Sequence, residues 1–165
     1  MEHLSRKYGP AAVARFSGPS NPLTVAGDKV GITFNNTRRV IPTKRCHQLM
    51  EYCSMAQPDK ANALMELMFK KYFEQAVDVS KPDVLVALAA EVGLDTVAAR
   101  AAVDDASPLR EQVVRNVDAT RQQLRVTGVP FVVIERRSGN GSPIKFSGAQ
   151  PPDVVAECLE EAAET

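Results

Sequence analysis

The sequence predicts an α/β chain that is mostly helical and ends in a β-hairpin followed by a helix. Three observations predict it. Apolar residues recur at helical spacing as far as about residue 126, residues 131–134 form a continuous apolar run rich in β-branched residues, and a Gly/Ser-rich turn leads to a second short strand. The 165 residues suit one domain, or a small domain that carries an insertion.

Composition excludes several classes of protein. Apolar residues make up 44% and charged residues 24%, which is ordinary for a globular chain and not for a disordered, collagen-like or coiled-coil one. Twenty Lys and Arg balance twenty Asp and Glu, so we expect no nucleic-acid partner. No apolar run approaches the ~20 residues of a membrane span, and the first seven residues lack a signal peptide's apolar stretch. We therefore expect no membrane partner.

The N-terminal third is expected to hold short helices and a long loop. Residues 4–8 read as a helix tail ended by Gly9, and a second helix runs from there to residue 16. Residues 17–42 are rich in Gly and Pro and are expected to form a loop, with a short extended piece over 30–34.

Two helices with clear inner faces are expected next. Thr43 is in position to cap the first, and the second covers residues 61–76. The residues at helical spacing on their inner faces are Cys46, Leu49, Met50 and Cys53, then Leu64, Met65, Met68 and Tyr72.

Three more helices complete the helical part. Ser80 and Asp83 form a capping box before the first, and Asp95 caps a short Ala-rich helix that ends near residue 104. Pro108 begins a longer helix that Gly128 is expected to end. Its inward-facing residues are expected to be Leu109, Val113, Val117 and Leu124.

The pattern then changes from helix to strand. A strand is expected over 131–135, joined by the turn residues 138–142 to a second strand over 144–147, which Gly148 ends. A last helix begins near Pro152. A two-stranded hairpin is only marginally stable alone. A run as apolar as 131–134 is typical of a strand with neighbours on both sides. No convincing partner strand stands upstream.

Gly128, Val129 and Pro130 form the most informative local motif. One interpretation is a trans proline that begins a strand, because cis bonds are only ~5–6% of X-Pro bonds in folded proteins. The other is a cis-proline turn that presents the Val129 backbone to an extended peptide or a thiol ligand. Local sequence leaves both open.

The cysteines are the candidate reactive groups. Cys46, Cys53 and Cys158 leave one unpaired, and no two have the spacing of a redox or zinc pair, so a reduced, cytoplasmic chain without a metal site is expected. Core packing is the ordinary role for such residues. Cys46 has the best case for reactivity, because a first-turn position and the neighbours Lys44 and Arg45 lower a thiol pKa. His47 is expected to be a packed histidine.

Several segments together resemble the DsbA-like thioredoxin-fold proteins, specifically the FrnE branch. The C-terminal segments that carry the resemblance are Gly128-Val129-Pro130-Phe131-Val132-Val133-Ile134 and Ser147-Gly148-Ala149-Gln150-Pro151-Pro152. The helical segments are Arg6-Lys7-Tyr8-Gly9, Pro42-Thr43 with His47, Leu67 to Phe73, and Ala89 to Asp95. The resemblance spans nearly the whole chain in order.

The resemblance implies a thioredoxin-like (DsbA-type) fold with a helical insertion domain, here 1–118, and a C-terminal thioredoxin-like part, 119–165. Pro130 matches the family's cis-proline, with Gly128 and Val129 before it as substrate-binding residues. The family's Cys-x-x-Cys lies in an N-terminal strand–helix–strand unit that has no counterpart here, so the chain is expected to be truncated or to have lost its dithiol. Cys46 stands where relatives usually have a small residue, which favours packing.

The function implied is that of a thiol–disulfide oxidoreductase acting on protein or small-molecule thiols and disulfides. No cofactor is expected, although glutathione is a candidate thiol partner, and the uncovered sheet edge predicts aggregation or a homodimer. Two alternatives stay open. One is a glutathione-dependent transferase or isomerase of the kappa or hydroxychromene-carboxylate isomerase type, which uses a serine near the first helix. The other is a non-catalytic, chaperone-like peptide-binding protein.

Overall fold

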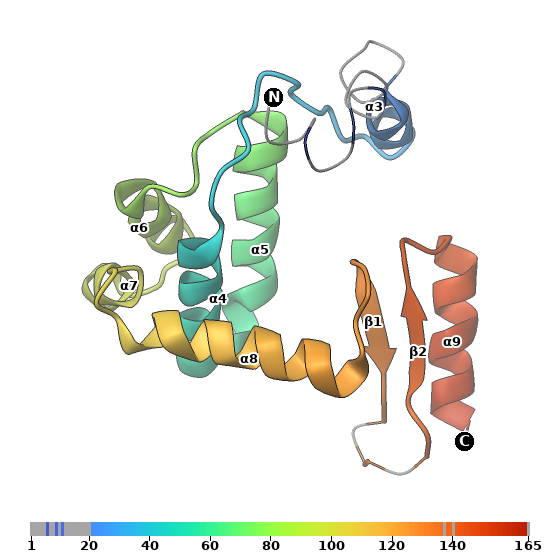
Figure 1. Cartoon of the computed structure of the whole chain (residues 1–165). Coiled ribbons are helices and arrows are strands. Elements are labelled where there is room, and N and C mark those ends of the chain that lie inside the picture. Colours follow the sequence, from blue (N-terminus) through green and yellow to red (C-terminus); the bar gives the residue numbers. More distant parts are fainter. Residues whose placement is uncertain are drawn as a thin grey trace. The chain divides into compact units, whose positions relative to one another are not determined.

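The computed structural model describes residues 6, 9, 11, 21–136, 138–139 and 141–164 (Figure 1). The helices expected over residues 4–16 therefore lie outside the described residues, apart from those three positions. Two compact units make up the chain, Met1–Val114 and Arg115–Thr165. The elements in chain order are α3 (Pro22–Asp28), α4 (Lys44–Ala56), the 3-10 turn η1 (Pro58–Lys60), α5 (Ala61–Phe69), the π-helical segment η2 (Lys70–Glu74), α6 (Pro82–Glu91), α7 (Thr96–Ala102), α8 (Pro108–Leu124), β1 (Phe131–Ile134), β2 (Ile144–Ser147) and α9 (Pro152–Glu164).

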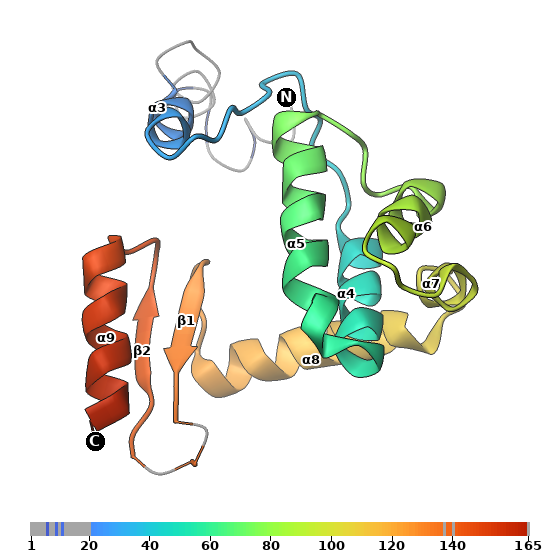
Figure 2. The same ribbon diagram turned by 180° about the vertical axis from the view of Figure 1, so that it is seen from behind.

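The C-terminal unit holds the predicted hairpin and final helix. β1 and β2 pair antiparallel, from Phe131 opposite Ser147 to Ile134 opposite Ile144, and α9 runs alongside them (Figure 2). The Arg136 side chain joins the end of β1 to the end of α9, because its Nε and Nη2 donate to the carbonyls of Ala162 and Ala163, each at 2.6 Å. The predicted bounds are confirmed, except that the first strand ends one residue earlier.

The outer edge of β1 is open among the described residues. Gly148 N donates to the Pro130 carbonyl at 2.8 Å, so these two form a hydrogen-bonded pair of the antiparallel ladder. Because such pairs alternate along a strand, Val132 and Ile134 bond to β2, while Phe131 and Val133 direct their backbone groups to the opposite edge. The described sheet has only these two strands, so no described strand pairs with that edge.

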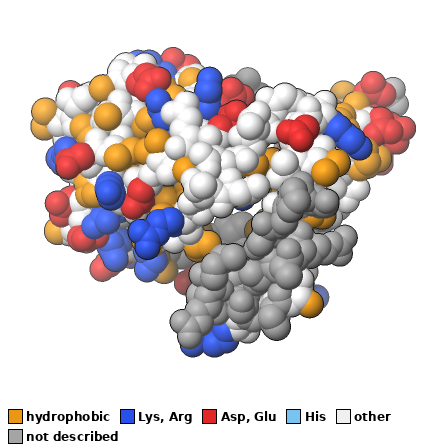
Figure 3. Space-filling model, turned by 90° about the horizontal axis from the view of Figure 1, so that it is seen from above, with side chains coloured by type: hydrophobic (Ala, Val, Ile, Leu, Met, Phe, Trp, Pro, Cys, Tyr) orange, Lys and Arg blue, Asp and Glu red, His pale blue; other side chains and the backbone are white. Residues whose placement is uncertain are grey.

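The described surface mixes both signs of charge. On the face drawn in Figure 3, Lys and Arg side chains lie among Asp and Glu side chains. This distribution agrees with the equal totals of basic and acidic residues in the sequence.

The described part of residues 17–42 differs from the expectation of one long loop. Residues 22–28 form a helix, because the Asn21 side chain accepts a hydrogen bond from Leu23 N at 2.9 Å and Pro22 fits the first turn. The expected extended piece over 30–34 is not a strand. Ile32 N donates instead to the carbonyl of Gly27 at 2.9 Å.

Hydrogen bonds and cation–π contacts hold residues 34–39 to η2. Asn35 N donates to the Phe73 carbonyl at 2.7 Å, and the Tyr72 hydroxyl donates to the Arg39 carbonyl at 2.9 Å. The Arg38 guanidinium lies 5.5 Å and 5.4 Å from the ring centroids of Phe34 and Phe73. This irregular segment is thus held at both its backbone and its side chains.

Three of the predicted helix boundaries need correction. Ser80 and Asp83 form no capping box, because Ser80 Oγ donates to Asp78 Oδ1 at 2.5 Å and α6 begins at Pro82. The helix that begins at residue 61 becomes a π-helix at residue 70. α8 ends at residue 124 with Arg125 in the left-handed region, φ 51°, rather than at Gly128.

The other cap predictions have mixed outcomes. Asp95 caps α7 as predicted, accepting from Ala98 N at 2.8 Å. Thr43 stands at the N-cap of α4, but its side chain makes no capping bond. On α8, Val113 is buried as predicted, whereas Val117 is 44% exposed.

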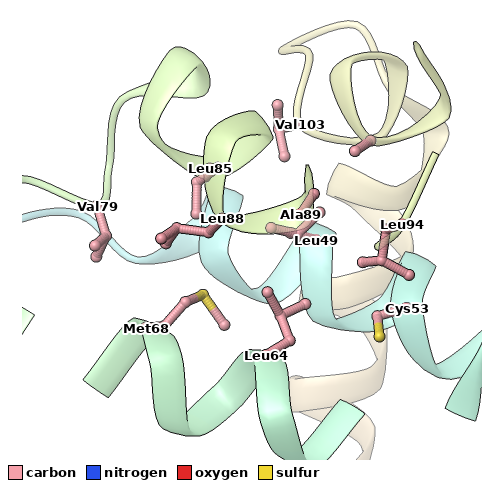
Figure 4. Packing of buried hydrophobic residues seen from close by; sticks show 11 residues of the cluster. Leu49, Cys53, Leu64, Met68, Val79, Leu85, Leu88, Ala89, Leu94 and Val103 are labelled. Atoms are coloured by element: carbon pink, nitrogen blue, oxygen red, sulfur yellow. The ribbon is translucent and has the colours of Figure 1, made fainter. Parts of the chain in front are cut away.

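The helical unit packs around one apolar core (Figure 4). The predicted inner faces of α4 to α6 are confirmed, since the following apolar residues on them are each at most 4% exposed: Leu49, Cys53, Leu64, Met68, Leu85, Leu88 and Ala89. Gln48 is also fully buried, which no pattern in the sequence indicated. Its Nε2 donates to the carbonyls of Ala102 and Asp104, both at 3.0 Å, which joins α4 to the end of α7.

Candidate substrate loop and cysteine thiols

The candidate substrate loop is the segment 128–130 between α8 and β1. The Val129–Pro130 peptide bond is cis, and Val129 is 87% exposed. The Pro130 carbonyl accepts the hydrogen bond from Gly148 N described above. The loop therefore combines an exposed residue with a neighbour that the end of β2 holds in place.

The two glycines beside this loop differ in their backbone conformation. Gly148 has φ +84°, in the left-handed region that favours glycine, and a Cβ there would meet nothing within 4 Å. Gly128 lies outside the left-handed region, and a Cβ there would lie 3.7 Å from Ser147 Oγ, an ordinary contact. Only Gly148 requires glycine for conformational reasons.

Cys46, the candidate reactive thiol, is poorly suited to nucleophilic attack. Burial raises the pKa of the Cys46 thiol. A backbone hydrogen bond opposes this, and the charge of Asp78 raises the pKa further. The thiol donates to the Val79 carbonyl at 3.4 Å. A raised pKa means less thiolate at neutral pH, so the thiol is less reactive than an ordinary cysteine.

The basic neighbours do not activate Cys46 as the sequence suggested. The Arg45 guanidinium forms an ion pair with Asp105, Nη2 to Oδ2 at 2.6 Å, and reaches the Ser80 carbonyl at 3.4 Å. The expectation that first-turn position and basic residues lower the pKa of Cys46 is therefore wrong. Desolvation dominates.

The other cysteines are also free thiols. Cys53 is fully buried in the core; burial raises the pKa of its thiol, as does the charge of Asp59, while Lys60 lowers it. Cys158 is partly buried on α9. The structure thus forms no disulfide from these three residues.

The described residues hold no cluster of three or more His, Cys, Asp and Glu side chains suited to a metal ion. His47, which was expected to be packed, is exposed. Within the described part of the chain, no helix is both long and apolar enough to cross a membrane.

These observations define a DsbA-like thioredoxin protein. The model of the DSBA-like thioredoxin domain matches residues 15–160, and the chain belongs to this family. The mostly helical architecture with a small sheet and a C-terminal helix is the form that this fold takes here.

A solved structure extends the comparison. The chain is similar to the crystal structure of a probable DsbA oxidoreductase from Streptomyces coelicolor, with 28% identity and a TM-score of 0.78. The match covers 98% of this chain and 66% of that one, so the chain spans about two thirds of that protein. No curated protein matches the sequence.

Proposed function

We propose that this chain is part of a DsbA-like thiol–disulfide oxidoreductase of the FrnE branch, to which it contributes the substrate loop and a helical domain. The observation that carries the proposal is the exposed Val129 beside Pro130, whose carbonyl accepts a hydrogen bond from Gly148 N. The chain's three cysteines include no Cys-x-x-Cys, so the dithiol would come from a segment outside this sequence. On this proposal the oxidoreductase activity would belong to a longer protein of which this chain is a part.

The reaction would proceed by two thiol–disulfide exchanges. The first enzyme thiolate attacks a substrate disulfide, forms a mixed disulfide and releases one substrate thiolate. The second enzyme cysteine then attacks the mixed disulfide, which leaves an oxidised enzyme and a reduced substrate; the reverse sequence oxidises a dithiol substrate. The exposed backbone of Val129 would bind the extended segment beside the disulfide through main-chain hydrogen bonds.

The remaining assignments complete the proposal. Residues 1–118 would form the helical domain and residues 119–165 the C-terminal part of the thioredoxin-like domain, in a cytoplasmic protein with protein or small-molecule thiol substrates. Glutathione would serve as a thiol partner rather than as a bound cofactor. The raised pKa of Cys46 supports placing the chemistry elsewhere.

The experiment that tests the proposal is determination of the complete transcript. A Cys-x-x-Cys encoded upstream and in frame is expected. A serine there would favour a glutathione-dependent transferase or isomerase, and the absence of both would favour a non-catalytic peptide-binding protein.

A reductase assay on the purified chain tests the same proposal biochemically. We expect no turnover of a disulfide substrate by the chain, by Cys46→Ala or by the matched Cys158→Ala variant. Turnover at rates typical of a dithiol enzyme, lost only in Cys46→Ala, would make Cys46 the catalytic residue and overturn the proposal.

We further infer that the isolated chain associates with a second copy through the open edge of β1. An unpaired strand edge is a template for another strand. Val133 directs its N–H to this edge, whereas Val132 directs its N–H to β2. Sedimentation should show dimers or larger species, which Val133→Pro should reduce while retaining the fold; Val132→Pro should unfold the hairpin. A stable wild-type monomer would contradict the inference.

A further inference from the structure

A small cavity lies within the helical unit and has no part in the proposed disulfide chemistry. Its volume is about 150 Å³. α4 and α5 supply three methionines to its wall, Met50, Met65 and Met68, and η2 supplies Tyr72 and Phe73. Methionine side chains are flexible and polarizable, so they adapt to the shape of a bound molecule.

The cavity has a buried floor and an exposed rim. Met68 and Val79 on the floor are each 4% exposed, whereas Phe69 on the rim is 53% exposed and His47 is exposed as well. An exposed apolar ring at the mouth and a buried apolar floor are what an entering ligand requires. The cavity is therefore accessible from solvent.

The polar side chains of the cavity are few, and two of them already donate hydrogen bonds. The Cys46 thiol donates to the Val79 carbonyl, and the Tyr72 hydroxyl donates to the Arg39 carbonyl. Thr43 and His47 remain, both exposed side chains. An ordered water needs two to four polar partners, so this cavity is poorly suited to water. No Lys or Arg lines it, and its one described histidine, His47, is exposed, so a carboxylate on the buried floor would lose its hydration without gaining a buried cationic partner.

The wall of the cavity also has an unusual backbone. η2 is π-helical, and the bond from Gln75 N to the Lys70 carbonyl at 3.2 Å closes it. Ala76, which follows, has φ +53°, a conformation that a non-glycine residue rarely adopts. π-helical turns and strained residues cluster at functional sites, and this one carries the aromatic wall of the cavity.

We propose that this cavity binds a neutral, apolar molecule about the size of one aromatic ring. An apolar cavity of about 150 Å³ holds a benzene molecule in another protein. The apolar floor and the absence of Lys and Arg from the lining favour an uncharged ligand over a carboxylate of the same size.

The test is a titration of the chain with toluene, observed through the ¹³C-labelled methyl groups of its methionines. We expect saturable shifts at Met50, Met65 and Met68. Met55 is 67% exposed and does not line the cavity, so its signal is an internal control and should not move. Benzoate at the same concentrations should shift none of them.

Other outcomes would overturn the proposal. These are unmoved signals at the three cavity methionines, a shift at Met55 that matches theirs, or an equal response to benzoate.

Two substitutions provide matched variants. Cys46→Phe fills the cavity and should abolish the toluene shifts. Thr43→Phe places a ring at the exposed rim and should block the mouth without changing the core. It therefore serves as the test if Cys46→Phe does not fold. Retained toluene shifts in a folded Thr43→Phe protein would contradict the location of the site.

Discussion

The contrast between Gly148 and Gly128 gives a prediction of opposite sign for two similar substitutions. Gly148→Ala places a side chain on a backbone at φ +84°, with no atom within 4 Å of the new Cβ. The effect is thus conformational strain alone. Gly128→Ala places the same side chain outside the left-handed region, in ordinary contact with Ser147 Oγ at 3.7 Å.

The magnitudes follow from these conformations. A non-glycine residue in the left-handed region costs about 1–2 kcal/mol, while the lower freedom of alanine in the unfolded chain offsets about 0.4–1 kcal/mol. Gly148→Ala should therefore lower the free energy of unfolding by about 1 kcal/mol. For Gly128→Ala only the second contribution applies, so the free energy of unfolding should stay level or rise by up to about 1 kcal/mol.

Hydrogen exchange of the Val132 amide is the appropriate assay, because this amide bonds to β2 and reports on the C-terminal unit. A loss of 1 kcal/mol corresponds to about fivefold faster exchange in Gly148→Ala. Gly148→Asn is a useful control, since asparagine tolerates the left-handed region and should exchange at an intermediate rate. Faster exchange in Gly128→Ala than in Gly148→Ala would refute the reasoning.

Three further predictions concern titration, packing and helix termination. Burial raises the pKa of Cys46, so the contribution of the neutral thiol to stability is present at neutral pH and is lost as the pH rises above about 8.5. Cys46→Ala should therefore lose less unfolding free energy than the wild type in urea titrations from pH 7 to 10. The same pH dependence in both proteins would contradict this prediction. Leu64→Ala should lower the free energy of unfolding by about 2–5 kcal/mol, because this side chain is fully buried, whereas Met55→Ala at an exposed position should change it by less than about 0.5 kcal/mol. Arg136→Met should lower the free energy of unfolding by about 1–2 kcal/mol, because it removes two hydrogen bonds to the last carbonyls of α9. Thermal unfolding measures this change, with Lys145→Met at an exposed position as the control. Equal effects of the two substitutions would show that those hydrogen bonds contribute nothing.

Helix faces and strands were predictable because their signals are local and periodic. Leu49 and Cys53 fall four residues apart on one helix, and both are fully buried. The apolar run at 131–134 and the turn after it define the hairpin in the same way. Periodicity of this kind depends on burial alone, which the sequence records directly.

Features that depend on distant residues were not predictable. The sequence places Arg45 beside Cys46, but Arg45 binds Asp105, 60 residues away, and burial decides the pKa of the thiol. Gln48 is buried because carbonyls 54 and 56 residues away accept its amide protons. The cavity depends likewise on a π-helical turn that no spacing of apolar residues indicates.

The attachment of residues 34–39 to η2 affects how readily a protease cleaves this segment. Arg38 and Arg39 form a pair of the kind that trypsin cleaves, in a segment without regular secondary structure. Cleavage requires an extended, accessible backbone, yet Arg38 lies over two aromatic rings and the Arg39 carbonyl accepts the Tyr72 hydroxyl. A tryptic cut at this pair therefore reports local opening of the segment, and the rate of that cut measures how often residues 34–39 separate from η2.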